Sequence, residues 1–136
     1  MKAEVRLVEG ATMMAKGSSG QWILMDPGVP SGGQGGAPSP MELVLIAYGG
    51  CIAMTATALL RKKAPGLEDL RVELEADLSE SRPHVFTHIT AKFIVHGKDL
   101  KEEDVEWAIS RAHEKYCPVG AMLGKVIELD YKWEIN

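Results

Sequence analysis

The sequence predicts an α+β domain in which antiparallel sheets pack around one long buried helix. Three observations support this prediction. Polar and apolar residues alternate over residues 67–78, 85–96 and 127–135, as they do in strands with one buried face. Residues 43–60 carry no charged side chain, and apolar residues recur at helical spacing over 105–116. Runs of strands separated by helices favour an α+β fold over a parallel sheet.

The N-terminal third is expected to form a strand pair followed by a loop. Residues 3–8 alternate and predict a half-buried strand, "KGSSGQ" is typical of a turn, and "QWILMD" predicts the returning strand. Residues 27–40 are rich in glycine and proline, which excludes a regular element. A mobile surface loop and a lid over a site are both open interpretations of this segment.

A long helix is predicted from Pro40 to about Lys63. Ser39 suits the cap, Pro40 suits the first helical position, and Glu42 completes a capping box. The uncharged run would span about 27 Å as a helix, short of the roughly 30 Å of a bilayer core. We therefore interpret it as a buried helix of a soluble protein. A helix that is apolar on all sides must be covered on all sides, which predicts a homodimer.

The C-terminal half is expected to alternate strands and helices. Two long alternating runs predict a hairpin across the turn "SESRPH". Asp99 and Glu102 match a second capping box, which predicts a helix that ends near Tyr116. Pro118 is expected to open a short new helix that continues through Leu123, and the last alternating run closes the chain as a strand.

Length and charge narrow the function classes. A chain of 136 residues is predicted to form a single domain over 1–136. Its net charge of −4 is scattered, and no basic block suggests nucleic-acid binding. The start "MKAEVRLVEG" lacks the apolar stretch of a secretory signal, which predicts a cytoplasmic protein. Because thiols are kept reduced there, a structural disulfide is not expected.

Two cysteines carry the chemical interest of the chain. Cys51 lies within the predicted long helix with no base close in sequence, which favours an inert thiol. Cys117 precedes Pro118 and would cap a helix that starts there. The positive end of that helix would stabilise a thiolate, so Cys117 is expected to be the more acidic thiol. Free cysteines are often buried and inert, so an inert pair and a redox pair both remain open.

A metal site is not favoured. Neither cysteine has a partner at CxxC spacing. His84 and His88 have the i, i+4 spacing of a helical metal pair, but they lie in a predicted turn and strand. There the rings would be about 13 Å apart, too far to share an ion. Both are expected to be surface histidines.

The motifs around the cysteines resemble a known family. "SPMELVLIAYGGCIAM" and the later "YCPVGAML", whose cysteine follows the first by 66 residues, resemble the OsmC/Ohr family and in particular its OsmC-like (YhfA-type) branch. The resemblance covers nearly the whole chain. It implies an OsmC-like fold, an intertwined homodimer and thiol-dependent peroxidase chemistry without a metal or organic cofactor. Cys51 would be the peroxidatic residue, and Cys117 would resolve its sulfenic acid as a disulfide.

Two positions depart from the family pattern. Family peroxidases have a glutamate ten residues before the first cysteine, where this chain has Met41, and Glu42 already suits the capping box. They also use an arginine from an N-terminal loop, whereas Lys16 is the only base between Arg6 and Arg61. A lysine cannot offer the same bidentate contact. Glu42 and Lys16 are the candidates for supporting roles.

The leading hypothesis is a cytoplasmic, dimeric hydroperoxide reductase with a role in oxidative stress and detoxification. Its redox pair would be Cys51 and Cys117, and its partners a dithiol reductant and a small apolar hydroperoxide, because a site between apolar helices favours an apolar tail. Neither nucleic acid nor a membrane is an expected partner. Two alternatives remain, because a fold does not fix a function. One is a non-catalytic protein that binds an apolar ligand at the dimer interface, and the other is a structural dimer with inert thiols.

Overall fold

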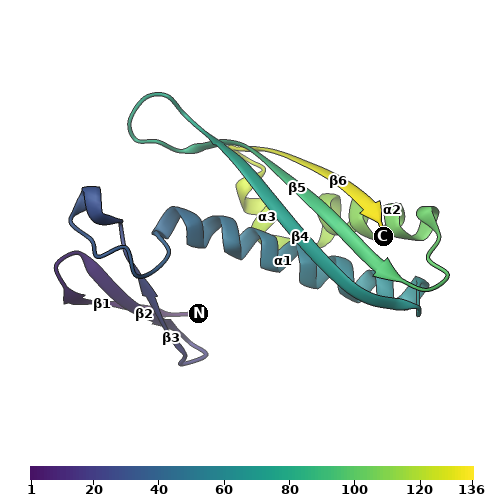
Figure 1. The fold of residues 1–136 in the computed structure, drawn as a ribbon, viewed down its shortest axis with the longest axis horizontal. Coiled ribbons are helices and arrows are strands. Elements are labelled where there is room, and N and C mark those ends of the chain that lie inside the picture. Colours follow the sequence, from purple (N-terminus) through teal and green to yellow (C-terminus); the bar gives the residue numbers. More distant parts are fainter. The chain divides into compact units, whose positions relative to one another are not determined.

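The computed structural model describes residues 1–136 and divides the chain into two compact units, Met1–Val44 and Leu45–Asn136 (Figure 1). Each unit contains one three-stranded sheet. The combination of two sheets with helices agrees with the predicted α+β class.

The first unit contains one strand more than predicted. Its strands β1 (Ala3–Glu9), β2 (Thr12–Gly17) and β3 (Trp22–Met25) form an antiparallel sheet in chain order. The prediction omitted β2 because "TMMAK" has no clear alternation of polar and apolar residues. The chain turns tightly into β2 at Gly10, whose φ of 57° suits glycine.

The predicted half-burial of the first strand is not found within this chain. Val5 and Leu7 of β1 are 59% and 63% exposed. Trp22, Ile23 and Leu24 of β3 are also exposed. Both edges of this small sheet therefore present apolar side chains that the first unit does not cover.

The glycine-rich loop is organised around one aspartate. Asp26 is only 2% exposed, and its carboxylate accepts hydrogen bonds from the backbone N–H groups of Gly28 (2.7 Å), Gln34 (2.8 Å) and Gly35 (3.2 Å). The Thr12 hydroxyl donates a fourth bond at 2.7 Å. Hydrogen bonds from Gln34 and Thr12 lower the pKa of Asp26 to about 2. A short 3₁₀ turn, η1 (Val29–Ser31), lies between Gly28 and Gln34.

The long helix α1 (Pro40–Lys63) begins and ends as predicted. Its capping box is confirmed, because the Ser39 hydroxyl accepts from the N–H of Glu42 at 3.2 Å and the Glu42 carboxylate accepts from the N–H of Ser39 at 2.7 Å. Three basic residues in the last turn, Arg61 to Lys63, complement the helix dipole.

The sheet of the second unit has one pairing that the sequence did not predict. Strands β4 (Leu67–Leu78) and β5 (Phe86–Gly97) form the expected antiparallel hairpin. The last strand, β6 (Glu128–Ile135), pairs with β5 in parallel, so the prediction of purely antiparallel sheets is wrong. The physical reason is the connection. Two strands joined by helices that cross one face of the sheet run in the same direction.

The crossover between β5 and β6 contains three helical pieces. They are α2 (Glu102–Arg111), the π-helical turn η2 (Ala112–Tyr116) and α3 (Pro118–Leu123). The predicted capping box at α2 is wrong. Asp99 adopts a φ of 54°, and Lys101 is the N-cap without a side-chain bond. Acidic residues in the first turn of α2 complement the helix dipole instead.

The helices of the second unit cover one face of its sheet, behind the strands in Figure 1. Alternate residues of β5 point toward α1 and α2 and form the hydrophobic core with them. The fully buried members from the three elements are Tyr48, Ile52, Ala56, Leu60, Ile89, Ala91, Phe93, Val95, Val105, Ala108 and Ile109.

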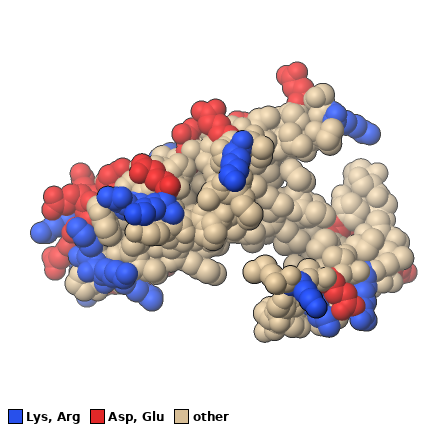
Figure 2. Space-filling model, turned by 180° about the vertical axis from the view of Figure 1, so that it is seen from behind, with Lys and Arg blue, Asp and Glu red and all other residues tan.

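The opposite side of α1 is not covered by the other elements of the second unit. Ile46 is 57% and Met54 is 75% exposed. Figure 2 shows a broad area of the second unit without lysine, arginine, aspartate or glutamate. By length and composition α1 could cross a membrane, but the core helix of a soluble protein passes the same test, and α1 contributes four fully buried side chains to the core. The dimer that would cover its free side stays a prediction.

Candidate thiol site

The structure brings the two cysteines together in the second unit. Cys51 lies at the middle of α1 and is half-buried, whereas Cys117 lies between η2 and α3 and is 2% exposed. Both are free thiols. Cys117 belongs to the hydrophobic core, and Cys51 packs against that core.

Cys117 is held as the cap of a short helix, as predicted. Pro118 follows at the first helical position, and the Cys117 Sγ accepts a hydrogen bond from the backbone N–H of Gly120 at 3.2 Å. On the other side, the N–H of Cys117 donates to the carbonyl of Ala112 at 3.1 Å, which closes the π-helical turn. One of these bonds holds the sulfur of Cys117, and the other holds its backbone.

The expected acidity of Cys117 is wrong. Its pKa is raised to about 11, chiefly by burial and to a smaller extent by the neighbouring Cys51 side chain, although the hydrogen bond from Gly120 acts in the opposite direction. A helix of six residues and one N–H bond do not offset the loss of water around a thiolate. The cap was predictable from the proline, but the burial was not.

A third group, Tyr48, lies at this site and was not predicted. It precedes Cys51 by three residues on α1, so both side chains occupy one face of the helix. Tyr48 is fully buried, and its hydroxyl is the one buried side-chain oxygen or nitrogen without a hydrogen-bond partner in the chain. Its pKa is raised to about 12, chiefly by burial, with smaller contributions from Cys117, Asp130 and Cys51.

Gly120 allows Tyr48 and Cys117 to lie close together. A Cβ atom at this position would lie 3.2 Å from Cε2 of Tyr48 and 3.3 Å from Sγ of Cys117. The edge of the tyrosine ring next to its hydroxyl and the cysteine sulfur therefore flank the same backbone atom. A side chain larger than hydrogen would push them apart.

The two predicted supporting residues belong to the first unit. Glu42 is engaged in the capping box at the start of α1. The Lys16 ammonium lies 3.5 Å from a Glu4 carboxylate oxygen and 4.6 Å from the centre of the Trp22 ring. Both side chains thus have local partners, and a role for either at the thiols stays a prediction.

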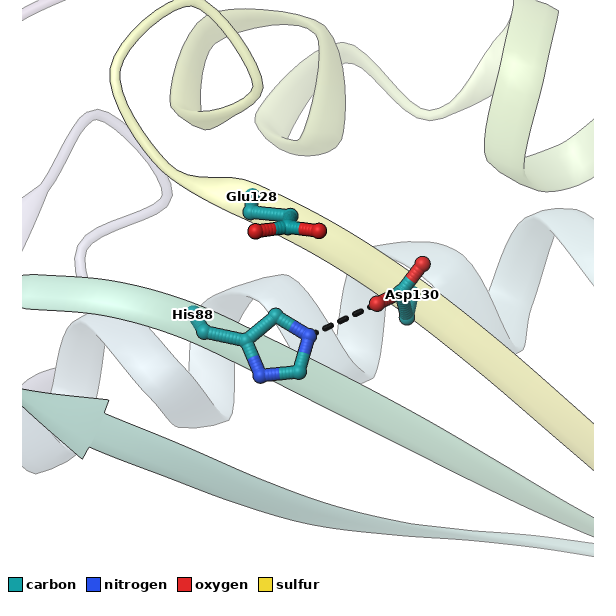
Figure 3. A group of neighbouring side chains, drawn as sticks. All are labelled: His88, Glu128 and Asp130. Atoms are coloured by element: carbon teal, nitrogen blue, oxygen red, sulfur yellow. Dashed lines mark hydrogen bonds and ion pairs between the residues drawn. The ribbon is translucent and has the colours of Figure 1, made fainter.

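His88 forms a charged cluster on the exposed face of the second sheet (Figure 3). Its Nε2 lies 2.7 Å from a carboxylate oxygen of Asp130, and its Nδ1 lies 3.4 Å from a carboxylate oxygen of Asp77. The carboxylate of Glu128 lies close to both His88 and Asp130. The hydrogen bond that His88 donates to the Asp130 carboxylate raises the pKa of His88. His84 lies apart, with its Nδ1 2.9 Å from the Ser79 carbonyl oxygen. The cluster is well explained as an imidazolium between carboxylates, and the i, i+4 histidine spacing gave no indication of it.

Comparisons with known proteins agree with the motifs around the cysteines. The family model described as OsmC-like protein matches residues 33–132. Protein YhfA of Escherichia coli strain K12 is 42% identical over 99% of this chain and 98% of its own length. A hypothetical protein from Aquifex aeolicus VF5 has a solved structure that is 30% identical, with a TM-score of 0.86 over 99% of this chain and 95% of the other.

More distant structures share the fold. One is an organic hydroperoxide resistance protein, OsmC, from Legionella pneumophila, which is 19% identical with a TM-score of 0.71 over 98% of this chain and 95% of its own. At that identity the likeness concerns the fold alone. The chemistry of this chain therefore depends on its own side chains.

Proposed function

Because this chain belongs to the OsmC-like protein family, we propose that it is a thiol-dependent peroxidase that reduces organic hydroperoxides with Cys51 and Cys117. One observation carries the proposal. Two cysteines 66 residues apart, the only two in the sequence, meet at one site without forming a disulfide. Two neighbouring free thiols are what a reversible two-electron redox step requires.

The different burial of the two sulfurs suggests their order of reaction. The half-buried Cys51 is the more accessible thiol, so its thiolate attacks the outer oxygen of the hydroperoxide. The O–O bond breaks, an alcohol leaves and Cys51 becomes a sulfenic acid. The buried Cys117 then attacks the Cys51 sulfur, which forms the disulfide and releases water. A dithiol reductant restores both thiols.

The surroundings favour an organic substrate. Both cysteines lie against the hydrophobic core, and neighbouring side chains on α1 and α3 are apolar. An apolar tail gains free energy by leaving water for such surroundings, whereas hydrogen peroxide does not. The reducing cytoplasm, the predicted location of the chain, would supply the dithiol.

A homodimer is part of the proposal. The uncovered apolar side chains of α1 and, separately, those of β1 and β3 need a partner surface. A second copy of the chain offers the same surfaces in return, as in a two-fold interface. The partner would also cover the exposed side of Cys51, which is half-buried in this chain.

A second candidate function is the binding of an apolar ligand without catalysis. The raised pKa of Cys117 and the local engagement of Lys16 favour it, because both leave the thiols without an evident activator. Such a protein would be stabilised by its ligand even when Cys51 is replaced by serine.

The decisive experiment follows the two thiols during titration of the reduced protein with cumene hydroperoxide and with hydrogen peroxide. Alkylation and mass measurement should show stoichiometric loss of both thiols to one intrachain disulfide, faster with the organic peroxide. Cys117→Ser should stop at a Cys51 sulfenic acid, and Cys51→Ser should not react. Survival of both thiols in excess peroxide would refute the peroxidase proposal.

A further inference from the structure

The buried hydroxyl of Tyr48 has no structural purpose within this chain. Burying a hydroxyl without a hydrogen-bond partner costs free energy, and phenylalanine would fill the same space without that cost. The Tyr48 ring also flanks Cys117 across Gly120, Cys51 follows on the same helical face, and both thiols act electrostatically on the Tyr48 hydroxyl. A group that destabilises the fold and adjoins reactive atoms is a candidate for a role in the reaction.

The proposed peroxidase cycle leaves two proton problems at this place. When the Cys51 thiolate breaks the O–O bond, the departing alkoxide needs a proton. Afterwards the Cys117 thiol must lose its own proton before its sulfur can attack. In a buried site, water is a poor partner for both transfers, and Cys117 is only 2% exposed.

We propose that Tyr48 is a catalytic residue that passes one proton to the departing alkoxide and takes one back from Cys117. This inference rests on the proposed function, and it adds a residue and a proton path to it. No residue other than Tyr48 needs to move a proton between the two thiol steps.

The atoms and charges balance. The Cys51 thiolate takes the outer oxygen and its hydrogen, which gives the sulfenic acid and an alkoxide. Tyr48 donates its Oη proton to the alkoxide, so the alcohol leaves and a tyrosinate remains. The tyrosinate removes the proton of Cys117, and the resulting thiolate attacks the Cys51 sulfur. The S–S bond forms, the S–O bond breaks, and hydroxide leaves to be protonated by solvent.

The acidities of the groups suit these transfers. An alkoxide is a stronger base than a tyrosinate, so the first transfer is favourable. The pKa of Tyr48 is raised to about 12 and that of Cys117 to about 11, so the two groups are similar in acidity and a proton can pass between them. The burial that makes Cys117 unreactive by itself therefore also makes the tyrosinate a base strong enough to activate it.

The test compares Tyr48→Phe with the matched variant Tyr131→Phe. Tyr131 lies in the same unit, and its hydroxyl donates to Glu106 at 2.9 Å. Rapid-quench measurements would separate loss of the Cys51 thiol, trapped as sulfenic acid, from closure of the disulfide. We expect Tyr48→Phe to slow closure roughly a hundredfold, to accumulate the sulfenic acid, and to make closure faster with rising pH. Tyr131→Phe should behave like the unmodified protein.

Each outcome has a defined meaning. If the unmodified protein closes the disulfide and Tyr48→Phe closes it at the same rate with the same pH profile, the role of Tyr48 is overturned and the peroxidase remains. If the unmodified protein forms no disulfide, the proposed function falls first. Should Tyr48→Phe fail to fold, fluorotyrosine at position 48 keeps the ring and lowers the pKa of the hydroxyl. The pH profile of closure must then shift with it, and an unchanged profile refutes the relay.

Discussion

The sulfur of Cys117 and the backbone N–H of Gly120 are joined by a 3.2 Å hydrogen bond inside the hydrophobic core. This contact places a thiol at the start of α3, yet the thiol remains a weak acid because it is shielded from water. Position and reactivity are thus set by different features. The helix cap fixes where the sulfur lies, and burial decides its protonation state.

The first prediction concerns Gly120. Gly120→Ala places a methyl group 3.2 Å from the Tyr48 ring and 3.3 Å from the Cys117 sulfur, so we expect it to lower the free energy of unfolding by about 1–3 kcal/mol. Urea denaturation measures this. The control is Gly50→Ala, whose added Cβ meets no atom within 4 Å in the chain and should be stabilising by roughly 0.5–1 kcal/mol in a helix. Equal effects of the two variants would show that the site is not tightly packed.

The second prediction separates the two possible roles of Glu42. Ser39→Ala removes half of the capping box and should cost about 1 kcal/mol of stability. Glu42→Gln keeps an oxygen acceptor, so it should cost less and leave the rate of Cys51 oxidation unchanged. Thermal melts and thiol-loss kinetics on the same samples check both statements. A strong loss of rate without loss of stability would assign Glu42 to the reaction instead.

The third prediction concerns acid stability of the first unit. The pKa of Asp26 is lowered from 3.8 to about 2 in the folded chain. Its carboxylate therefore stabilises the fold at a pH above the pKa that Asp26 has in the unfolded chain. That contribution is lost as the pH falls through the folded pKa of about 2. The melting temperature should decline between pH 4 and 2 in the unmodified protein. The decline should be smaller in Asp26→Asn and unaltered in the control Asp69→Asn, which changes an exposed carboxylate.

The fourth prediction concerns His88, whose pKa is raised above 6.5 by Asp130. The protonated ring stabilises the fold at a pH below the pKa that His88 has in the unfolded chain. This contribution is lost as the pH rises through the higher pKa that His88 has in the folded chain. An NMR titration should show that Asp130→Asn lowers the pKa of His88. Asp77→Asn should have a smaller effect, because its carboxylate lies farther from the ring, at 3.4 Å. An unchanged titration in Asp130→Asn would contradict the ion pair.

Much of the fold could be predicted because periodicity and capping are local properties. The bounds of α1 follow from Ser39 and Glu42 at its start and from the sequence "APG" after Lys63, and the β4–β5 hairpin follows from alternation. The parallel pairing of β6 could not be read locally, since it depends on the side on which α2 and α3 cross. β2 was missed for lack of alternation, and Asp99 matched a motif whose backbone it does not adopt.

The residues of the candidate site could also be predicted only in part. Family motifs identified the two cysteines, and the proline identified the cap of α3. The burial of Cys117 and Tyr48 could not be predicted from the residues next to them in the sequence. The acidity expected of Cys117 was therefore wrong, and Tyr48 was overlooked. The helical spacing of three residues between Tyr48 and Cys51 was the available signal.

The parallel β5–β6 ladder also has a consequence for the order in which the second unit folds. β6 ends at Ile135, and Asn136 donates its backbone N–H to Val95 at 2.9 Å, so this last strand extends the sheet along β5. The β4–β5 hairpin pairs neighbouring segments and can form early. The β5–β6 pairing joins segments that are separated by all the helical pieces of the crossover, so we expect it to form later and to limit the rate at which this sheet is completed.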